Sequence, residues 1–266
     1  MSSENRRTTD TKPVTVGING VAGQMGQTLV ETGTRRDDLT VAFGIDTADA
    51  IDTETGVPAY TPEETAGALT EHTPDVVVDF SVPEATIDLA DACAEAGVGL
   101  VIGTTGFQDG DLSSLQEIST VVPVLKATNF SRGIQALLRA LGPAIEALPE
   151  YDIEVLETHH NRKRDAPSGT AKTILETIAD QREFETVSGR EGIQPREEGE
   201  VGMLVRRAGN VRGEHEVLLA GNDEVLTLTH RAEDRAVFAA GALDSAVWVA
   251  GQPPDWYSFD DVISGV

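Results

Sequence analysis

The strongest constraint on the fold is the alternation of short apolar runs with helical patterns through the first half of the chain. Pro83 suits a first helical turn and Gly97 suits a C-cap, so the stretch between them reads as a helix. Strands that alternate with helices form a parallel sheet covered on both faces. The sequence therefore predicts an α/β domain of the Rossmann type, with a doubly wound parallel sheet. The expected strands are residues 13–18, 39–46, 74–81, 98–106 and 121–131.

The second half changes character at the strand-like run 153–160. One helix follows, and then three strand-like runs are separated only by glycine turns. Because no helix separates these three runs, we expect antiparallel pairing and an α+β domain with a mixed or antiparallel sheet. A helical pattern with apolar residues three and four apart returns at 234–251. The three runs are residues 201–209, 213–221 and 224–232.

These patterns divide the chain of 266 residues into two domains, each long enough to form a core. We expect a discontinuous first domain at 13–130 with 236–266 and a second domain at 131–235. Residues 1–12 are polar throughout and are expected to form a flexible tail.

A glycine-rich turn, VGINGVAGQMG, joins the first expected strand to the first helix. In a dinucleotide-binding fold such a turn must be tight, and its backbone must approach a pyrophosphate bound at the helix N-terminus. Asp46 ends the second strand, where a carboxylate can accept hydrogen bonds from a ribose diol. A plain strand–helix turn and a solvated Asp46 are the alternatives. Since Thr47 follows and no arginine is close behind, NADH should bind at least as well as NADPH.

Two more loops follow the ends of expected strands, GTTGF at 103–107 and ATNFSRG at 127–133. Ligands of parallel sheets bind at the carboxyl ends of the strands. The small polar residues of these loops could therefore contact a nicotinamide, and they could equally be turns.

The run ETHHNRKRDAPSGTA, residues 157–171, gathers positive charge in a chain whose formal net charge is −25. A helix is expected to begin near Ser168, so that Ser168, Gly169 and Thr170 present free N–H groups. Such a helix end favours an anion, and Lys163 can reach the same place. The run therefore predicts a carboxylate or phosphate pocket. His159 ends a strand beside it and carries the side chain most suited to moving a proton near neutral pH.

Other interpretations of the basic residues and histidines remain open. Adjacent strand residues point to opposite faces, so His159 and His160 do not form a metal site, and we expect no metal. Arg162 and Arg164 could simply balance local acid. The remaining histidines are interpreted as core or surface groups at His215 and His230, and as exposed at His72.

Composition excludes several classes of protein. The single cysteine rules out an intramolecular disulfide framework, and no apolar run is long enough for a membrane span. The polar N-terminus lacks the apolar segment of a secretory signal, so we expect a cytoplasmic protein. Its 45 acidic residues are dispersed, which would repel nucleic acid and points to a salt-adapted, halophilic cytoplasm.

Several motifs together resemble the 4-hydroxy-tetrahydrodipicolinate reductases, also called dihydrodipicolinate reductases, of lysine and diaminopimelate biosynthesis. The resemblance covers almost all of the chain after residue 12 and rests above all on the HHxxKxDAPSGTA signature. The other motifs are GINGVAGQMG, VIGTTGF, ATNFSRG, RAGNVRGEHEVLLAG and LTHRAEDRAVFAAGAL.

The resemblance implies a fold, an activity and a set of site residues. It implies a Rossmann-type domain, a second domain that binds a small dicarboxylate substrate and assembles a homotetramer, and NADH or NADPH as cofactor. His159 would be the catalytic proton donor and acceptor, and Lys163 a catalytic proton donor. Substrate contacts carry over to His160, Ser168, Gly169 and Thr170. Cofactor contacts carry over to Gly20, Val21, Ala22, Gly23, Gln24, Met25, Asp46, Gly103, Thr104, Thr105, Ala127, Thr128, Asn129 and Phe130.

Two positions depart from the family pattern, which often has a basic residue where Thr47 stands and an arginine where Val82 stands. Both departures weaken the case for a preference for NADPH. The alternatives to the reductase are another two-domain NAD(P) oxidoreductase of amino-acid metabolism and a non-catalytic module that senses a dinucleotide or a dicarboxylate.

Overall fold

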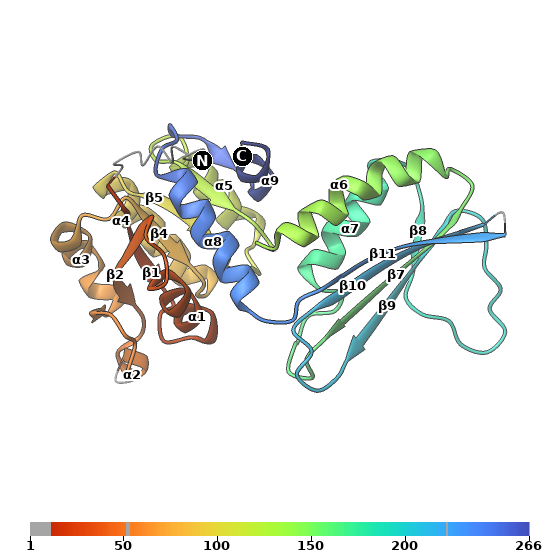
Figure 1. The fold of residues 1–266 in the computed structure, drawn as a ribbon, viewed down its shortest axis with the longest axis horizontal. Helices are drawn as coiled ribbons and strands as arrows, with labels where there is room; N and C mark the ends of the chain where they lie inside the picture. The colour runs from red at the N-terminus through yellow and green to blue at the C-terminus, as the bar shows by residue number, and fades with distance from the viewer. Residues whose placement is uncertain (1–11, 52–53, 222, 266) are drawn as a thin grey trace, which may run out of the picture. The chain divides into compact units, whose positions relative to one another are not determined.

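The computed structural model describes residues 12–51, 54–221 and 223–265, and these residues form two compact units (Figure 1). The first unit contains the described residues up to Lys126 together with 242–257. The second contains 127–241 and 258 to the C-terminal end. Most of the expected tail, residues 1–11, lies outside the described residues.

The first unit is built on a seven-stranded sheet in the order β12-β6-β5-β4-β1-β2-β3, in which every pairing is parallel. Its inner strands are buried on both faces, which explains their continuous apolar sequences, such as the valines of β4. The predicted doubly wound sheet is thereby confirmed. The strands are β1 (Val14–Asn19), β2 (Leu39–Ile45), β3 (Ala59–Tyr60), β4 (Val76–Asp79), β5 (Gly99–Ile102), β6 (Val124–Lys126) and β12 (Trp256–Tyr257).

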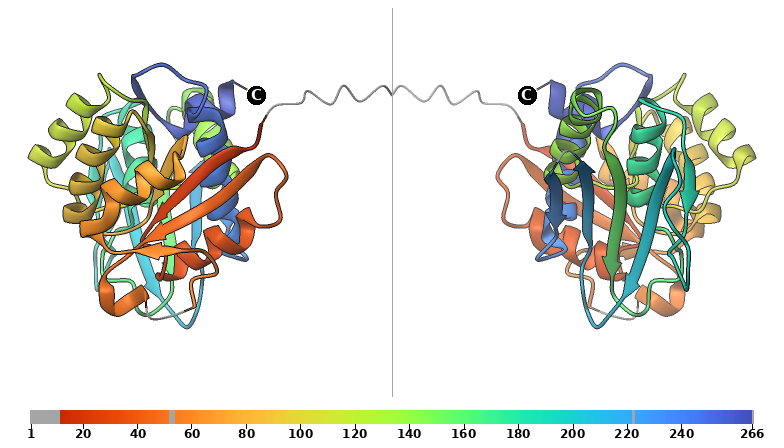
Figure 2. Two further views of the ribbon diagram at one scale, coloured as in Figure 1. Left: turned by 90° about the vertical axis from the view of Figure 1, so that its left-hand side faces the viewer. Right: turned by 90° about the vertical axis from the view of Figure 1, so that its right-hand side faces the viewer.

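Helices cover both faces of this sheet, as the left view of Figure 2 shows. On one face α3, α4 and α5 pack over a core that includes Phe43, Leu89 and Leu115. On the other, α1 and α8 lie close together, since Arg36 after α1 pairs with Asp244 of α8. The helices are α1 (Gln24–Gly33), α2 (Ala48–Ile51), the 3₁₀ turn η1 (Pro62–Glu64), α3 (Thr65–His72), α4 (Pro83–Ala96), α5 (Asp109–Ile118) and α8 (Ala236–Val249).

The second unit contains a five-stranded sheet in the order β11-β10-β7-β9-β8, whose strands lie side by side in the right view of Figure 2. The helices α6 and α7 cover one face, and the apolar residues that alternate along the strands form the core beneath them. The elements are α6 (Arg132–Ala147), β7 (Asp152–His159), α7 (Gly169–Ala179), β8 (Glu185–Val187), β9 (Glu200–Arg207), β10 (Glu214–Gly221), β11 (Glu224–Arg231) and α9 (Phe259–Ser264).

The expected antiparallel pairing is correct for only part of this second sheet. β10 pairs antiparallel with β11 and with β7, but β9 does not pair with β10. Instead β9 lies parallel to β7 and to β8. The physical reason is the helix α7 between β7 and β9, which supplies the crossover that a parallel pair requires. The sheet is therefore mixed.

The unit boundaries differ from those expected because of contacts made by two short segments. Phe130 packs against Phe259 of α9, and a side chain at Gly241 would collide with the backbone of Phe130. Arg139 of α6 binds Asp260 of α9. Residues 127–130, 236–241 and 258–265 therefore belong with the second unit, where the sequence had placed them in the first.

Candidate active site

The glycine-rich turn between β1 and α1 has the geometry needed to approach a phosphate. Gly20 has a φ of 79°, and a Cβ there would lie 2.4 Å from the carbonyl oxygen of Phe80. A Cβ on Gly26 would lie 2.1 Å from the carbonyl oxygen of Gly20, so the helix can pack on the turn only without a side chain. Gly23 is the N-cap of α1, and the N–H groups of the first helical turn have no acceptor within the helix. These residues fit a dinucleotide pyrophosphate.

Asp46 lies beside this turn and supports it. One oxygen of its carboxylate accepts a hydrogen bond of 2.9 Å from the Ala22 N–H, and the other accepts one of 2.8 Å from the Thr47 N–H. Each carboxylate oxygen can accept further bonds, so a ribose hydroxyl can still bind Asp46. The side chain of Val21 is fully buried, so only its backbone can contribute to a ligand site.

A buried carboxylate, Asp79, joins the loops at the carboxyl ends of β1, β4 and β5. It accepts hydrogen bonds from Asn19 at 2.8 Å and from Thr104 at 2.6 Å. Two more come from Ser81 at 2.5 Å and Thr86 at 2.7 Å. The hydroxyl of Thr104, which was expected to contact the cofactor, is therefore used inside the protein.

The loop at 127–130 lies against the first turn of α7 in the second unit. Asn129 donates a hydrogen bond of 2.9 Å to the Thr170 hydroxyl, and the hydroxyls of Thr128 and Thr173 are 3.4 Å apart. The ring of Phe130 is 2% exposed, so of this expected contact only the backbone can face a ligand.

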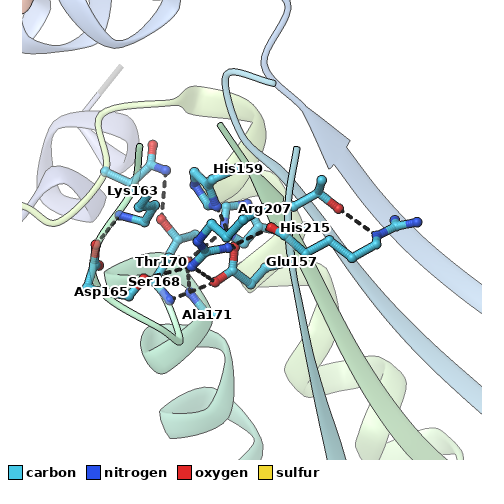
Figure 3. A network of polar contacts seen from close by, with 12 residues as sticks. Glu157, His159, Lys163, Asp165, Ser168, Thr170, Ala171, Arg207 and His215 are labelled. Atoms are coloured by element: carbon cyan, nitrogen blue, oxygen red, sulfur yellow. Dashed lines mark hydrogen bonds and ion pairs between the residues drawn. The ribbon is translucent and has the colours of Figure 1, made fainter. Parts of the chain in front are cut away.

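His159 ends β7, and its position is set by Glu157 two residues earlier on the same face of the strand (Figure 3). Its Nδ1 lies 2.5 Å from Oε2 of Glu157. Arg207, the register partner of His159 on the parallel strand β9, donates two hydrogen bonds of 2.8 Å to the same carboxylate. Glu157 is fully buried.

The electrostatics of Glu157 follow from these contacts. Burial alone would raise its pKa, but the hydrogen bonds from His159 and Arg207 outweigh burial and hold the pKa at about 2. Near neutral pH the group is therefore a carboxylate, which can only accept hydrogen bonds.

The N-terminus of α7 is formed as expected, with one correction. Ser168 is the N-cap, and its hydroxyl accepts a hydrogen bond of 3.2 Å from the Ala171 N–H. The Ser168 N–H, however, is not free, because it donates to Oε1 of Glu157 at 3.0 Å. Within the part of the chain that the structure describes, the N–H groups of Gly169 and Thr170 have no acceptor. They point to where an anion can bind.

Lys163 and His160 lie in the loop between β7 and α7. Nζ of Lys163 lies 2.8 Å from a carboxylate oxygen of Asp165. Burial by itself would raise the pKa of Asp165, but the hydrogen bond from Lys163 and its positive charge together lower it. Burial, together with the positive charges of Arg162 and Arg235, lowers the pKa of His160, which favours its neutral form. Nδ1 of His160 is buried and has no partner within the described residues.

His215 belongs to the same cluster. It is 2% exposed, lies opposite Glu157 in the antiparallel register of β10 and β7, and its Nε2 is 3.1 Å from the Ser168 hydroxyl. Its ring meets that of His159 edge to face at 5.2 Å between centroids. Burial is the main cause that lowers the pKa of His215 to about 3, and the charge of His159 adds to it.

Three residues of this cluster, Glu157, Arg207 and His215, were therefore not predicted from the sequence as members of the site. One local signal could have pointed to Glu157: it stands two positions before His159, so the two side chains lie on the same face of the strand. Among the other histidines, His72 was wrongly interpreted as exposed: it is half-buried, stacks on Phe43 and lies 2.8 Å from the Tyr60 hydroxyl.

Two negative findings apply to the described residues only. None of their helices has the length and apolar character to cross a membrane. No three of their histidine, cysteine or acidic side chains are grouped to hold a metal ion.

Comparison with known proteins identifies the family. The model for the N-terminal part of dihydrodipicolinate reductase matches residues 14–130, and the model for its C-terminal part matches residues 133–263. A 4-hydroxy-tetrahydrodipicolinate reductase of Haloarcula marismortui is 55% identical over 248 residues, which is 93% of this chain and 98% of that protein. The protein of the same name from Caulobacter vibrioides is 40% identical over 95% of this chain and 98% of its own length.

A solved structure supports the fold independently of close sequence similarity. The dipicolinate-bound dihydrodipicolinate reductase of Paenisporosarcina sp. TG-14 is 24% identical and superimposes with a TM-score of 0.75, over 93% of this chain and 98% of that one. Since the two family models together span nearly all of the sequence, the chain belongs to the dihydrodipicolinate reductase family.

Proposed function

We propose that this chain is an oxidoreductase that uses NADH or NADPH to reduce 4-hydroxy-tetrahydrodipicolinate to tetrahydrodipicolinate with loss of water, a step of lysine and diaminopimelate biosynthesis. Membership of the family supports this activity. The observation that assigns this activity to particular residues is the cluster at the end of β7. There His159 is held by the buried carboxylate of Glu157, which also binds the N-cap residue of α7, Ser168.

The substrate is a dicarboxylate, and the second unit offers the groups that such a dianion requires. We assign its carboxylates to the N–H groups of Gly169 and Thr170, to the Ser168 hydroxyl and to His160. Lys163 adds a positive charge that a carboxylate can draw away from Asp165. A chain with a net charge of −25 repels a dicarboxylate, and the clustered basic residues offset this repulsion where the substrate binds.

Proton transfer falls to His159 and Lys163. Nδ1 of His159 is held by Glu157, so the other ring nitrogen, Nε2, is the one that can exchange a proton with the substrate. Lys163 is the second proton donor, and an acid placed at the departing hydroxyl assists the loss of water.

The cofactor belongs to the first unit. A bound nicotinamide supplies the hydride that reduces the ring. The N–H groups of Gly20 and Val21 donate to Ile45, that of Ala22 donates to Asp46 and that of Gly23 donates to Gly20, so we assign the pyrophosphate to the N–H groups of Gln24 and Met25 in the first turn of α1. Asp46 would accept from the ribose, and the backbone of 103–105 would line the nicotinamide side. Because Asp46 repels a 2′-phosphate and Thr47 offers no positive charge, NADH should serve at least as well as NADPH.

Two broader features, the oligomeric state and a salt-rich cytoplasm, are proposed on separate grounds. Leu204 and Val225 are exposed on strands of the second sheet, which supports assembly through this sheet into the homotetramer expected for the family. A sedimentation experiment in molar salt that detects only monomers would contradict it. The dispersed acid supports a cytoplasm rich in salt, and activity should rise with KCl because salt screens the self-repulsion of the surface.

The activity is tested by following cofactor oxidation at high salt, with the substrate made in the cuvette by a synthase from pyruvate and aspartate semialdehyde. Turnover with NADH equal to or above that with NADPH is expected. His159→Gln should lower kcat by about 1000-fold with little change in substrate binding, since general acid–base catalysis contributes on this scale. A folded wild-type protein that oxidises neither cofactor would contradict the proposed function.

A further inference from the structure

We infer that Glu157 and Arg207 are positioning residues of this reductase, which together fix the tautomer of His159 and the turn that receives the substrate carboxylate. The inference rests on the proposed function. Neither residue need touch the substrate: both act through the groups that do.

The carboxylate of Glu157 is saturated with donors from three elements (Figure 3). Its Oε2 accepts from His159 on β7 and from Arg207 on β9. Its Oε1 accepts from Arg207 again and from the N–H of Ser168, the N-cap of α7. A fully buried carboxylate with this many donors has one arrangement that satisfies them all, so it holds these donors in fixed relative positions.

The direction of the bond to His159 follows from chemistry. A carboxylate has no proton to give, so Nδ1 of His159 must carry one and donate it. The neutral ring then has an unprotonated Nε2. A Cβ on Gly213 would lie 3.2 Å from this nitrogen, so glycine at that position leaves Nε2 room for a ligand. Glu157 thus determines which ring nitrogen can exchange a proton with the substrate.

Arg207 extends the same control to the loop before α7. Beside its two bonds to Glu157, its Nη2 donates to the carbonyl oxygen of Asp165 at 2.7 Å. Asp165 in turn pairs with Lys163. The Glu157–Arg207 pair therefore connects His159, the loop that carries Lys163 and the N-terminus of α7 in one network of polar contacts.

The variant Glu157→Gln separates this role from simple structural support. A glutamine amide has one accepting oxygen and one donating NH₂ group. If the oxygen takes the place of Oε1, it still accepts from Nη2 of Arg207 and from Ser168. The NH₂ group then faces Nδ1 of His159 and also Nη1 of Arg207, so the bond from Nη1 is lost. Nδ1 can become an acceptor by moving its proton to Nε2, whereas the Ser168 N–H cannot. The variant should therefore keep the substrate turn and invert the tautomer.

The kinetic expectation is a fall in kcat of about 100-fold, with the substrate KM little changed, because a wrongly protonated base loses the rate but not the binding. Glu157→Asp retains a carboxylate and should recover part of the lost kcat. The matched control is Glu154→Gln, which breaks another carboxylate–arginine pair on the same strand, with Arg196, away from the cluster. Its kcat should stay close to wild type.

The tautomer is measured directly by ¹⁵N NMR of histidine-labelled protein, with His159→Gln used to identify the signal. The spectrum is recorded as a function of pH, and in the neutral form of the ring wild type should show a protonated Nδ1 and an unprotonated Nε2, and Glu157→Gln the reverse. The NMR measurement does not require an active enzyme. A wild-type protein that is inactive but has the expected tautomer would therefore contradict the proposed function and leave the present inference standing. Should Glu157→Gln fail to fold, the wild-type tautomer and the kcat of Glu157→Asp carry the test. An active enzyme in which Glu157→Gln turns over like Glu154→Gln, or a wild type whose neutral His159 ring is protonated on Nε2 rather than Nδ1, would overturn the inference.

Discussion

The two units each contain a fully buried carboxylate at the end of a strand, and the donors around them differ in kind. Asp79 in the first unit accepts from four neutral side chains, and three of these are hydroxyls. Glu157 in the second unit accepts twice from a guanidinium, once from an imidazole and once from a backbone N–H.

This difference indicates what each carboxylate is for. A hydroxyl can donate or accept, so the shell around Asp79 can rearrange if the carboxylate changes. A guanidinium and a backbone N–H can only donate, so in the shell around Glu157 the His159 ring alone can change between donor and acceptor. Asp79 is suited to fastening loops of the cofactor site together. Glu157 is suited to holding one protonation pattern next to a group that transfers protons.

Removing the positive partner should produce the largest change. Arg207→Ala leaves Glu157 buried without its guanidinium, and breaking a buried ion pair in this way costs about 3–5 kcal/mol of unfolding free energy. Urea unfolding at neutral pH and constant salt measures it. A loss no greater than that of a neutral-network variant such as Thr86→Val would remove the distinction between the two carboxylates.

Acid should affect the second unit mainly through Glu157 and His215, the two acid-responsive groups of this unit whose pKa values are lowered furthest. The pKa of Glu157 is lowered from 4.5 to about 2, so the stability it contributes is present above pH 4.5 and is lost as pH falls toward 2. The pKa of His215 is lowered from 6.5 to about 3, so the unfolded chain binds a proton first and stability falls from pH 6.5 toward 3.

Between pH 6.5 and 4.5 the protonation of His215 in the unfolded chain should lower the free energy of unfolding by about 2–3 kcal/mol. His215→Asn should therefore flatten the dependence of unfolding free energy on pH in this window. Thr86→Val, which removes no titrating group, should keep the wild-type slope. Equal slopes in His215→Asn and wild type would show that His215 does not control the acid response.

A smaller effect is expected at Asp79. In Asp79→Asn the new NH₂ group can donate to a hydroxyl that previously donated, so the loss of unfolding free energy should be about 1–2 kcal/mol. Because three loops of the cofactor site meet at this residue, the Kd for NADH should rise, while the tautomer of His159 should not change. Calorimetric titration with NADH measures the Kd. An unchanged Kd would show that Asp79 supports the fold only.

The smallest effect is expected when one hydroxyl is removed from the neutral network. Thr86→Val takes one of four donors from Asp79 and keeps the shape of the side chain. The expected loss is about 1 kcal/mol of unfolding free energy, measured by the same urea titration. A loss as large as that of Arg207→Ala would contradict the adaptable character of this network.

The parts of the site that depend on neighbours in sequence could be predicted, and those that depend on strand register could not. The glycine turn, Asp46 and the N-cap Ser168 follow from local patterns of strand, turn and helix. Arg207 is 50 residues from Glu157 in the sequence. Its place beside His159 follows from the parallel register of β7 with β9.

From the sequence, β9 was expected to pair with β10, and that pairing gives no reason for Arg207 to lie beside Glu157. The same limit hid the environment of His215, which lies 47 residues from Ser168. Asp79 was overlooked for a related reason: three of its donors come from the ends of three different strands and the fourth comes from α4. Nothing in the local pattern of β4 distinguishes a buried acid from a solvated one.

The most direct test of the account compares kcat for Glu157→Gln and Glu154→Gln at saturating NADH and substrate. Both variants neutralise a carboxylate on β7 that pairs with an arginine, and one of them adjoins His159. We predict a kcat about 100-fold below wild type for Glu157→Gln, with an unchanged substrate KM, and a kcat close to wild type for Glu154→Gln. Equal turnover by the two variants would contradict it.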